Sequence, residues 1–301
     1  MKRTTVLLLL CVTLALGGCR RQAADFDTLT DKEKLEVLDF EVERHPKDAD
    51  VHARRAEVLL NLGRVKEAIV DIDKAVSLEP KKVDYRLRQA DAYFANGDVE
   101  NSYKALSEAE HLAPESVEVQ LKMGEITFYS RDYDRSMQNL SKVTAKEPNN
   151  RTALFMKGFI YKEKGDTANA VTLLQRVCDL YPDYASAFEE LGVLYASRSN
   201  PMAVEYLNTA ITLEPSNTNA LYALAMYYQE RGEMEPAESL YHRMLDINEH
   251  SADAWHNLGY IEMTHYQDYG RAVEYFDKAL EADPDMQAAI INRQLAIEMQ
   301  K

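Results

Sequence analysis

The sequence predicts an all-α solenoid, in which one pair of helices is copied and stacked along the chain. Prolines recur at a fixed spacing of 34 residues, at Pro46, Pro80, Pro114, Pro148 and Pro182. The same phase continues through Pro215, after 33 residues, and Glu249, and it returns at Pro284. Stacked supersecondary units keep such a period, whereas a single-copy globular fold does not. We therefore expect the function to lie in a surface of the stack rather than in a catalytic pocket.

Glycines and small residues keep the same phase and divide each repeat into two helices. A glycine stands 17 residues before four of the period positions: Gly63, Gly97, Gly165 and Gly232. Glycine accepts the left-handed conformation that ends a first helix. Five positions later every repeat has a small residue: Ala68, Ser102, Ser136, Ala170, Ala203, Ala237 and Ala272. We expect these small side chains to let two helices approach closely, and the prolines to stop the second helix.

Two repeats depart from the spacing. One residue is missing before Ala203, and one is inserted before Ala272. We expect Asn200 and Pro201 to absorb the deletion, as an N-cap followed by a proline in the first turn of a helix. Two repeats have an arginine in place of the loop glycine, at Arg131 and Arg198.

The recurring residues resemble the tetratricopeptide repeat (TPR) family, whose pattern is W-x₂-L-G-x₂-Y, then A-x₃-F, then P. The best match is Trp255-x₂-Leu258-Gly259, followed by Ala272-x₃-Phe276 and Pro284. The resemblance implies a right-handed superhelical solenoid of seven helix-turn-helix (TPR) units over residues 49–286. The units start near residues 49, 83, 117, 151, 185, 218 and 252.

Single helices are expected to cover both ends of the array, because the end of a solenoid otherwise leaves an apolar face in water. Thr30 and Glu33 form the capping-box pattern that begins a helix, which places an N-terminal helix within residues 31–48. A C-terminal capping helix is expected over residues 287–301. There, Ile291 and Leu295 fall on one stripe with Ala288, and we expect this stripe to be buried.

The first twenty residues predict a bacterial lipoprotein signal. A basic start is followed by an apolar stretch, which is too short to cross a membrane. Leu16-Gly17-Gly18-Cys19 then resembles a lipobox, in which the cysteine is lipidated and becomes the mature N-terminus. We expect a signal peptide over residues 1–18, lipidation at Cys19, a flexible tether over residues 19–30, and stable anchoring by two or more acyl chains. The alternative is an ordinary secretory signal with an incidental cysteine.

The residue after Cys19 bears on where an anchored protein would reside. It is Arg20, and not the Asp that retains many such proteins at the inner membrane. The resemblance therefore favours a location in the cell envelope at the outer membrane, facing the periplasm of a two-membrane bacterium.

Composition and motifs argue against several classes of function. The 50 acidic and 35 basic residues give a net charge of −15, which disfavours nucleic acid as a partner. The histidines lack metal-ligand spacing, and the glycines follow the repeat instead of forming a phosphate loop. We therefore expect no cofactor, no metal and no enzymatic activity. Cys178 stands at an apolar phase of a second helix, where we expect a buried side chain.

In the TPR family the first helices line a concave groove, with the second, fifth, ninth and twelfth residues of each unit pointing into it. Carried over to this chain, the resemblance indicates two zones. The N-terminal zone is acidic and apolar: Glu57, Asp91, Phe94, Glu125 and Phe128. The C-terminal zone is aromatic and rich in methionine: Phe155, Phe159, Tyr222, Met226, Tyr260 and Met263. Arg54, Arg88 and Lys122 lie four residues after acids of the first zone, and we expect them to neutralise part of it.

Three functions are consistent with these patterns. The first is a lipid-anchored scaffold that binds envelope or secreted proteins in the groove, within assembly or secretion machinery. Its partner would carry an apolar segment, with basic residues on the flank that meets the acidic zone. The second is a subunit of a homo-oligomer, in which a second copy closes the groove. The third is a binder of peptidoglycan fragments, with Tyr222 and Tyr260 stacking on sugars.

A Cys19→Ser substitution should abolish lipid attachment. Metabolic labelling with a palmitate analogue should label the wild-type chain and leave the variant unlabelled, because the thiol is the acceptor in the lipobox reading. Equal labelling of the two proteins would show that the cysteine is incidental.

Overall fold

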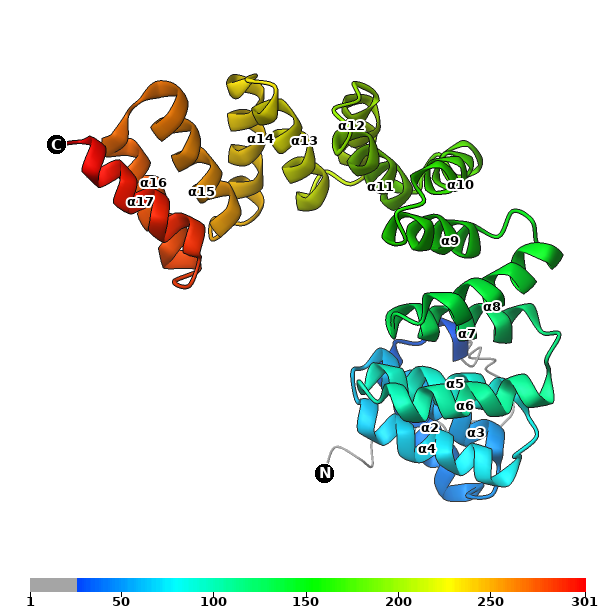
Figure 1. The fold of residues 1–301 in the computed structure, drawn as a ribbon. Coiled ribbons are helices and arrows are strands. Elements are labelled where there is room, and N and C mark those ends of the chain that lie inside the picture. The colour runs from blue at the N-terminus through cyan, green and yellow to red at the C-terminus, as the bar shows by residue number, and fades with distance from the viewer. Residues whose placement is uncertain (1–25) are drawn as a thin grey trace, which may run out of the picture. The chain divides into compact units, whose positions relative to one another are not determined.

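The computed structural model describes residues 26–301, and this part of the chain consists of helices joined by short turns (Figure 1). It divides into two segments, residues 26–114 and Glu115–Lys301. The N-terminal segment contains η2 (Phe26–Thr28), α2 (Asp31–Arg44), α3 (Ala49–Asn61), α4 (Val65–Leu78), α5 (Val83–Ala95) and α6 (Val99–Leu112). The predicted signal peptide and Cys19 lie outside the described residues.

The C-terminal segment continues the alternation of first and second helices. Its first three pairs are α7 (Val117–Tyr129) with α8 (Tyr133–Lys146), α9 (Arg151–Glu163) with α10 (Thr167–Leu180), and α11 (Ala185–Ala196) with α12 (Met202–Leu213). Then follow α13 (Thr218–Glu230) with α14 (Met234–Ile247), α15 (Ala252–Ile261) and η3 (Glu262–Tyr266) with α16 (Tyr269–Ala282), and finally α17 (Gln287–Met299). Each first helix packs against the second helix that follows it. The predicted all-α fold of stacked helix pairs is confirmed.

The turn chemistry follows the sequence prediction closely. All four loop glycines have a left-handed backbone, with φ between 71° and 78°. Arg131 adopts the same conformation with φ 58°. In the shortened repeat the left-handed residue is Ser199, with φ 51°, and not Arg198 as the phase predicted. Each second helix ends two residues before its period position, as Leu78 does before Pro80. Where that position is a proline, the residue preceding it avoids the helical conformation.

The small residues mark the closest contacts between paired helices. The seven alanines and serines of the repeat are at most 2% exposed. Ser136 Oγ donates a hydrogen bond to the Gly124 carbonyl of the preceding helix, at 2.8 Å. On the first helix, a Cβ added at Gly192 would lie 2.6 Å from Leu207 Cγ. The paired helices therefore pack too closely for even one more methyl group at this point.

The two irregular repeats absorb their length changes at helix ends. The deletion shortens the start of α12, where Asn200 Oδ1 accepts a hydrogen bond from the Met202 amide at 3.0 Å. The insertion is taken up by η3, a π-helical turn over Glu262–Tyr266, followed by Gln267 with φ 58°. A π-helical turn holds one more residue than an α-helical turn. The contact between α15 and α16 therefore keeps its register despite the extra residue.

The N-terminal helix α2 begins with the expected capping box. The Thr30 amide donates to Glu33 Oε2 at 2.9 Å, and the Glu33 amide donates back to Thr30 Oγ1 at 3.4 Å. Residues 26–30, predicted as the end of a flexible tether, contain η2 and the N-cap of α2. Phe26 packs on the apolar cluster around Leu35 and Leu38, with the Arg54 guanidinium 4.4 Å from its ring centroid.

The stripe predicted for the C-terminal helix is wrong. Helix α17 packs through Ala289 and Ala296, which are fully buried, whereas Ile291 and Leu295 are 63% and 43% exposed. The inserted residue explains the difference. Because of it, equivalent positions of α15 and α17 are 35 residues apart instead of 34. Ala289 and Ala296 then share the phases of the buried residues Ala254 and Ile261.

Cys178 is buried, as predicted, with 5% of its surface exposed. Burial raises the pKa of its thiol to about 12. The thiol therefore stays protonated at neutral pH and is a poor nucleophile.

A Gly192→Ala substitution should destabilise the C-terminal segment by about 1–3 kcal/mol, because the new methyl group would overlap Leu207. Urea unfolding followed by circular dichroism measures the change. Gly270→Ala in α16 is the matched control, since its Cβ would meet only ordinary contacts at 3.5 Å. The control should be neutral or more stable by up to about 1 kcal/mol. Equal effects at the two glycines would contradict the proposed packing constraint.

Candidate protein-binding surface

The first helices of the C-terminal segment form its inner layer. α9 contacts α7 and α11, α11 also contacts α13, and α15 contacts α17, whereas successive second helices contact each other less. Helices that lie closer together line the concave side of a stack. We call the side chains at the second, fifth, ninth and twelfth positions of these first helices the groove face. All predicted site residues except Cys19 and Met263 belong to such positions of first helices in the two segments, and Met263 lies in η3.

Three phenylalanines of the groove face are partly buried against neighbouring aromatic rings. The Phe128 and Phe159 ring centroids lie 5.3 Å apart, in an edge-to-face arrangement. The Phe155 ring meets that of Tyr184 at 5.2 Å in the same manner. Edge-to-face pairs are the favoured aromatic geometry. These contacts hold the rings in place while part of each ring stays accessible on the groove face.

A cation and a carboxylate hold the same region together. Lys162 Nζ lies 4.4 Å from the Phe159 ring centroid and 2.5 Å from Glu190 Oε2. The Glu190 side chain is only 17% exposed. Burial raises the pKa of its carboxyl above the ordinary value, although the hydrogen bond and the charge of Lys162 oppose this shift. Lys162 therefore fixes the aromatic ring and partly compensates a buried carboxylate.

Further along the groove face the predicted residues differ in accessibility. Tyr222 and Met226 are partly buried, and the Tyr241 hydroxyl, which donates to Gln229 Oε1 at 2.8 Å, lies 3.2 Å from Met226 Sδ. Tyr260 is 39% exposed. Met263 is 6% exposed and belongs to the core cluster around Phe276, so its assignment to the binding surface is corrected. The π-helical turn that starts at Glu262 changes the phase of the residues after it.

Acidic residues in and beside the acidic zone are paired with basic residues of the chain. Arg88 forms ion pairs with Glu57 of the preceding repeat and, at 3.0 Å, with Asp84. Arg54 pairs with Glu41 at 3.7 Å rather than with Asp50, whose partner is Lys82 at 4.0 Å. The other predicted members, Asp91, Phe94 and Glu125, also have interactions with other residues.

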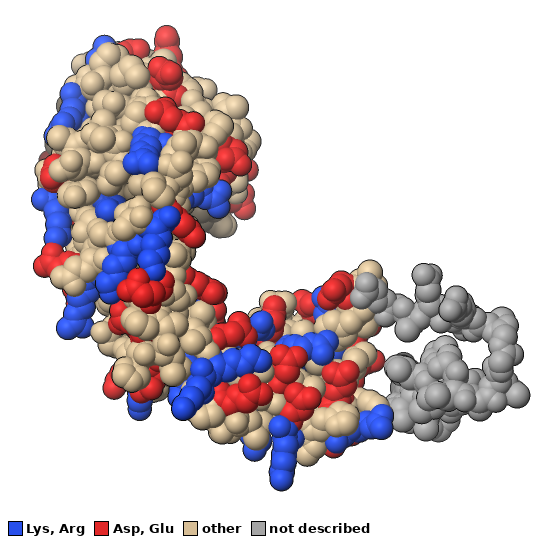
Figure 2. Space-filling model, turned by 90° about the vertical axis from the view of Figure 1, so that its right-hand side faces the viewer, with Lys and Arg blue, Asp and Glu red and all other residues tan. Residues whose placement is uncertain are grey.

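On the face visible in Figure 2, basic and acidic side chains lie interspersed. Exposed charges of opposite sign that lie this close together largely cancel at longer distances. We therefore expect weaker long-range steering by the acidic zone than the sequence alone suggested.

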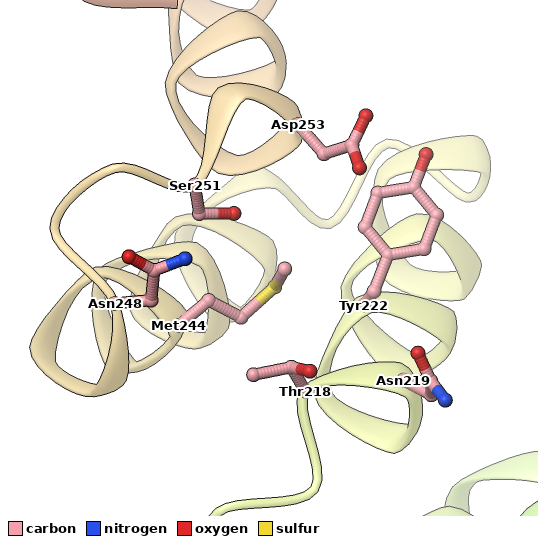
Figure 3. A pocket seen from close by; sticks show the side chains of 7 residues that line it. All are labelled: Thr218, Asn219, Tyr222, Met244, Asn248, Ser251 and Asp253. Carbon is pink, nitrogen blue, oxygen red and sulfur yellow. The ribbon is translucent and has the colours of Figure 1, made fainter. Parts of the chain in front are cut away.

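A cavity of about 180 Å³ opens on the groove face between α13 and the junction of α14 with α15 (Figure 3). Its lining combines hydroxyl, amide and carboxylate groups with one thioether and one aromatic ring: Thr218, Asn219, Tyr222, Met244, Asn248, Ser251 and Asp253. Of these, the sequence singled out only Tyr222 as a site residue. Helical phase could not identify Met244, on a second helix, or Asn248 and Ser251, which flank a loop.

The groove face continues onto α17, which the sequence pattern did not indicate. Ile291 and Leu295 follow His256 and Tyr260 by the same 35 residues. Next to them, Asn292 Nδ2 lies 3.1 Å from His256 Nε2, which ties α17 to α15. The apolar part of the groove face therefore extends past the last complete helix pair.

Comparison with known proteins agrees with this architecture. Tetratricopeptide repeat models match residues 49–82, 152–184 and 222–287. The chain therefore contains tetratricopeptide repeats. The curated relative protein O-mannosyl-transferase Tmtc3 of Drosophila melanogaster is 28% identical over 111 residues, 36% of this chain. This chain spans only 12% of the length of that relative.

Two solved structures resemble most of the chain. The APC/C hetero-tetramer Cut9-Hcn1 matches with a TM-score of 0.65 at 15% identity, over 89% of this chain and 52% of the matched one. PilW, a widely conserved type IV pilus biogenesis factor, matches with a TM-score of 0.63 at 18% identity, over 68% of this chain and 96% of PilW. At these identities the likeness shows the fold, a TPR solenoid. That fold is typical of non-catalytic scaffolds for protein–protein interaction.

A Lys162→Met substitution should cost about 1–3 kcal/mol of stability at neutral pH, because it leaves the partly buried Glu190 carboxylate without its partner. The folded-state pKa of Glu190 lies above its ordinary value of 4.5, so protonation of this group favours the folded state. The loss of stability should have its full size above the folded-state pKa of Glu190. It should shrink as the pH falls toward 4.5 and Glu190 becomes protonated.

Urea unfolding of wild type and variant at several pH values measures this difference. Lys164→Met is the matched control, because Lys164 pairs with an Asp134 carboxylate that is 82% exposed. This substitution should cost at most about 1 kcal/mol of stability. A loss in Lys162→Met that is independent of pH would show that Glu190 is not the group involved.

Proposed function

We propose that this chain is a lipid-anchored scaffold of the bacterial cell envelope, which binds a segment of another protein on the groove face of its C-terminal segment. The observation that carries the proposal is the set of large side chains on that face. Phe155, Phe159, Tyr222 and Met226 are held in place by their neighbours and are still partly accessible. Aromatic side chains of this kind dominate the energy of protein interfaces.

The chemistry of the surface defines the partner. Aromatic rings beside the polarisable thioether of Met226 suit an apolar peptide or an amphipathic helix. Tyr260, Ile291 and Leu295 add exposed apolar area, which enlarges the surface available to such a segment. A scaffold is favoured over an enzyme, because the fold is typical of non-catalytic interaction proteins.

The envelope location rests on the lipobox at Cys19, with the outer membrane facing the periplasm as the proposed site. In this proposal the acylated Cys19 anchors the chain to the bilayer. Among residues 26–301 no helix is long and apolar enough to cross a membrane. PilW, a pilus biogenesis factor, shares the fold. A pilus biogenesis factor with the same fold is a precedent that supports a role in assembly or secretion machinery.

A Phe159→Ala/Tyr222→Ala double variant should weaken partner binding by more than about 1 kcal/mol, because it removes two anchors of the groove face. Crosslinking pull-down from the native envelope identifies the partner, and titration with that purified partner measures the loss. Circular dichroism should show unchanged helical content.

The matched control is Leu180→Ala/Ile247→Ala, which removes exposed apolar side chains at the ends of second helices. The control should bind as wild type. If the groove variant binds normally while the control loses the partner, the partner docks on the second helices and the proposal is wrong.

A further inference from the structure

The cavity between α13 and α15 is lined by exposed or partly exposed polar side chains, several of which pair with no residue in the described part of the chain. The Asp253 carboxylate forms no ion pair with any residue in 26–301, and its side chain accepts no hydrogen bond there. Within the same range, the hydroxyl groups of Tyr222, Thr218 and Ser251 also have no hydrogen-bond partner. This differs from the acidic zone, where Glu57 and Asp84 are paired with Arg88.

The side chains around the cavity are arranged as a cup with an apolar floor. Met244 is 4% exposed and reaches into the centre from α14. The Tyr222 ring stands on the opposite side, and the Asp253 carboxylate lies beside its hydroxyl end (Figure 3). The Ser251 hydroxyl and the Asn248 amide point inward from the Met244 side (Figure 3). The cavity volume of about 180 Å³ suits a single long side chain rather than a helix.

From this arrangement we infer that the cavity is a subsite for one Lys or Arg side chain of the segment bound on the groove face. The inference rests on the proposed function and specifies its partner. The methylene stem of such a side chain packs against the Met244 thioether and the Tyr222 ring. Its cationic group then pairs with Asp253 and hydrogen-bonds to the neighbouring hydroxyl oxygens.

Other side-chain classes fit the cup less well. An acidic side chain would bring a second negative charge next to Asp253, which is unfavourable. A purely apolar side chain would cover the carboxylate and the Ser251 hydroxyl without pairing them, and burying unpaired polar groups is costly. A basic residue flanked by apolar residues therefore matches both this subsite and the rest of the groove face.

The test uses the full chain carrying Cys19→Ser and labelled with ¹³C at the methionine methyl groups. The probes are the Nα-acetyl methylamides of lysine and of norleucine, which share the stem but differ in charge. The lysine probe should shift the Met244 methyl resonance saturably and bind about two- to fivefold more tightly than the norleucine probe, the range expected for an exposed ion pair. A Met244→Leu variant assigns the resonance.

Asp253→Asn should remove the preference for lysine, whereas Asp246→Asn, on the exposed side of α14, should leave it intact. Equal binding of the two probes by the wild type, or an unchanged preference in Asp253→Asn, would overturn the subsite. If the lysine preference fails while the Phe159→Ala/Tyr222→Ala variant still loses its partner, the subsite is wrong and the groove function stands. If the preference holds while that variant keeps its partner, the proposed function is wrong instead.

Discussion

The close contact between the two helices of each pair is the constraint on which the rest of this structure depends. At Gly192 the first helix has no room for a Cβ beside Leu207, and at Ser136 the second helix hydrogen-bonds to the Gly124 carbonyl of the first. One stripe of every first helix is therefore buried against the second helix of the same pair. Residues such as Ala254 and Ala289 commit a second stripe to the neighbouring repeats. The stripe that is left over is the groove face, so packing alone decides which side chains a partner can meet.

The same constraint explains where the array tolerates changes in length. The deletion falls at the start of α12, beside Pro201, and the insertion falls in the π-helical turn that follows α15. Neither change moves the small residues Ala203 and Ala272, which are fully buried against their first helices. A length change inside the contact would rotate one helix by about 100° per residue relative to the other. It would then place a large side chain where only a small one fits.

The periodic part of the structure could be predicted from sequence, because period and residue size determine it directly. Gly63 and its equivalents specify the turns, and Pro80 and its equivalents specify the helix ends. Features that depend on a broken period could not be predicted. Met263 is buried because the π-helical turn changes its helical phase. Ile291 is exposed because the inserted residue also shifts the phase of α17, which follows it. The ion-pair partners could not be predicted either, because Arg88 pairs with Glu57 on another helix. The cavity at Met244 combines two first helices with a second helix and its following loop, an arrangement that helical spacing along one element does not reveal.

The central claim is that the groove face of the C-terminal segment is where the partner binds. Site-specific photo-crosslinking in the native envelope tests it directly, with benzoylphenylalanine placed at Met226 or Tyr260 on the groove face and at Leu180 or Ile247 on second helices. Our account predicts that Met226 and Tyr260 crosslink to the same protein, whereas Leu180 and Ile247 give no such product. Crosslinks to a common partner from the second-helix positions alone would contradict it.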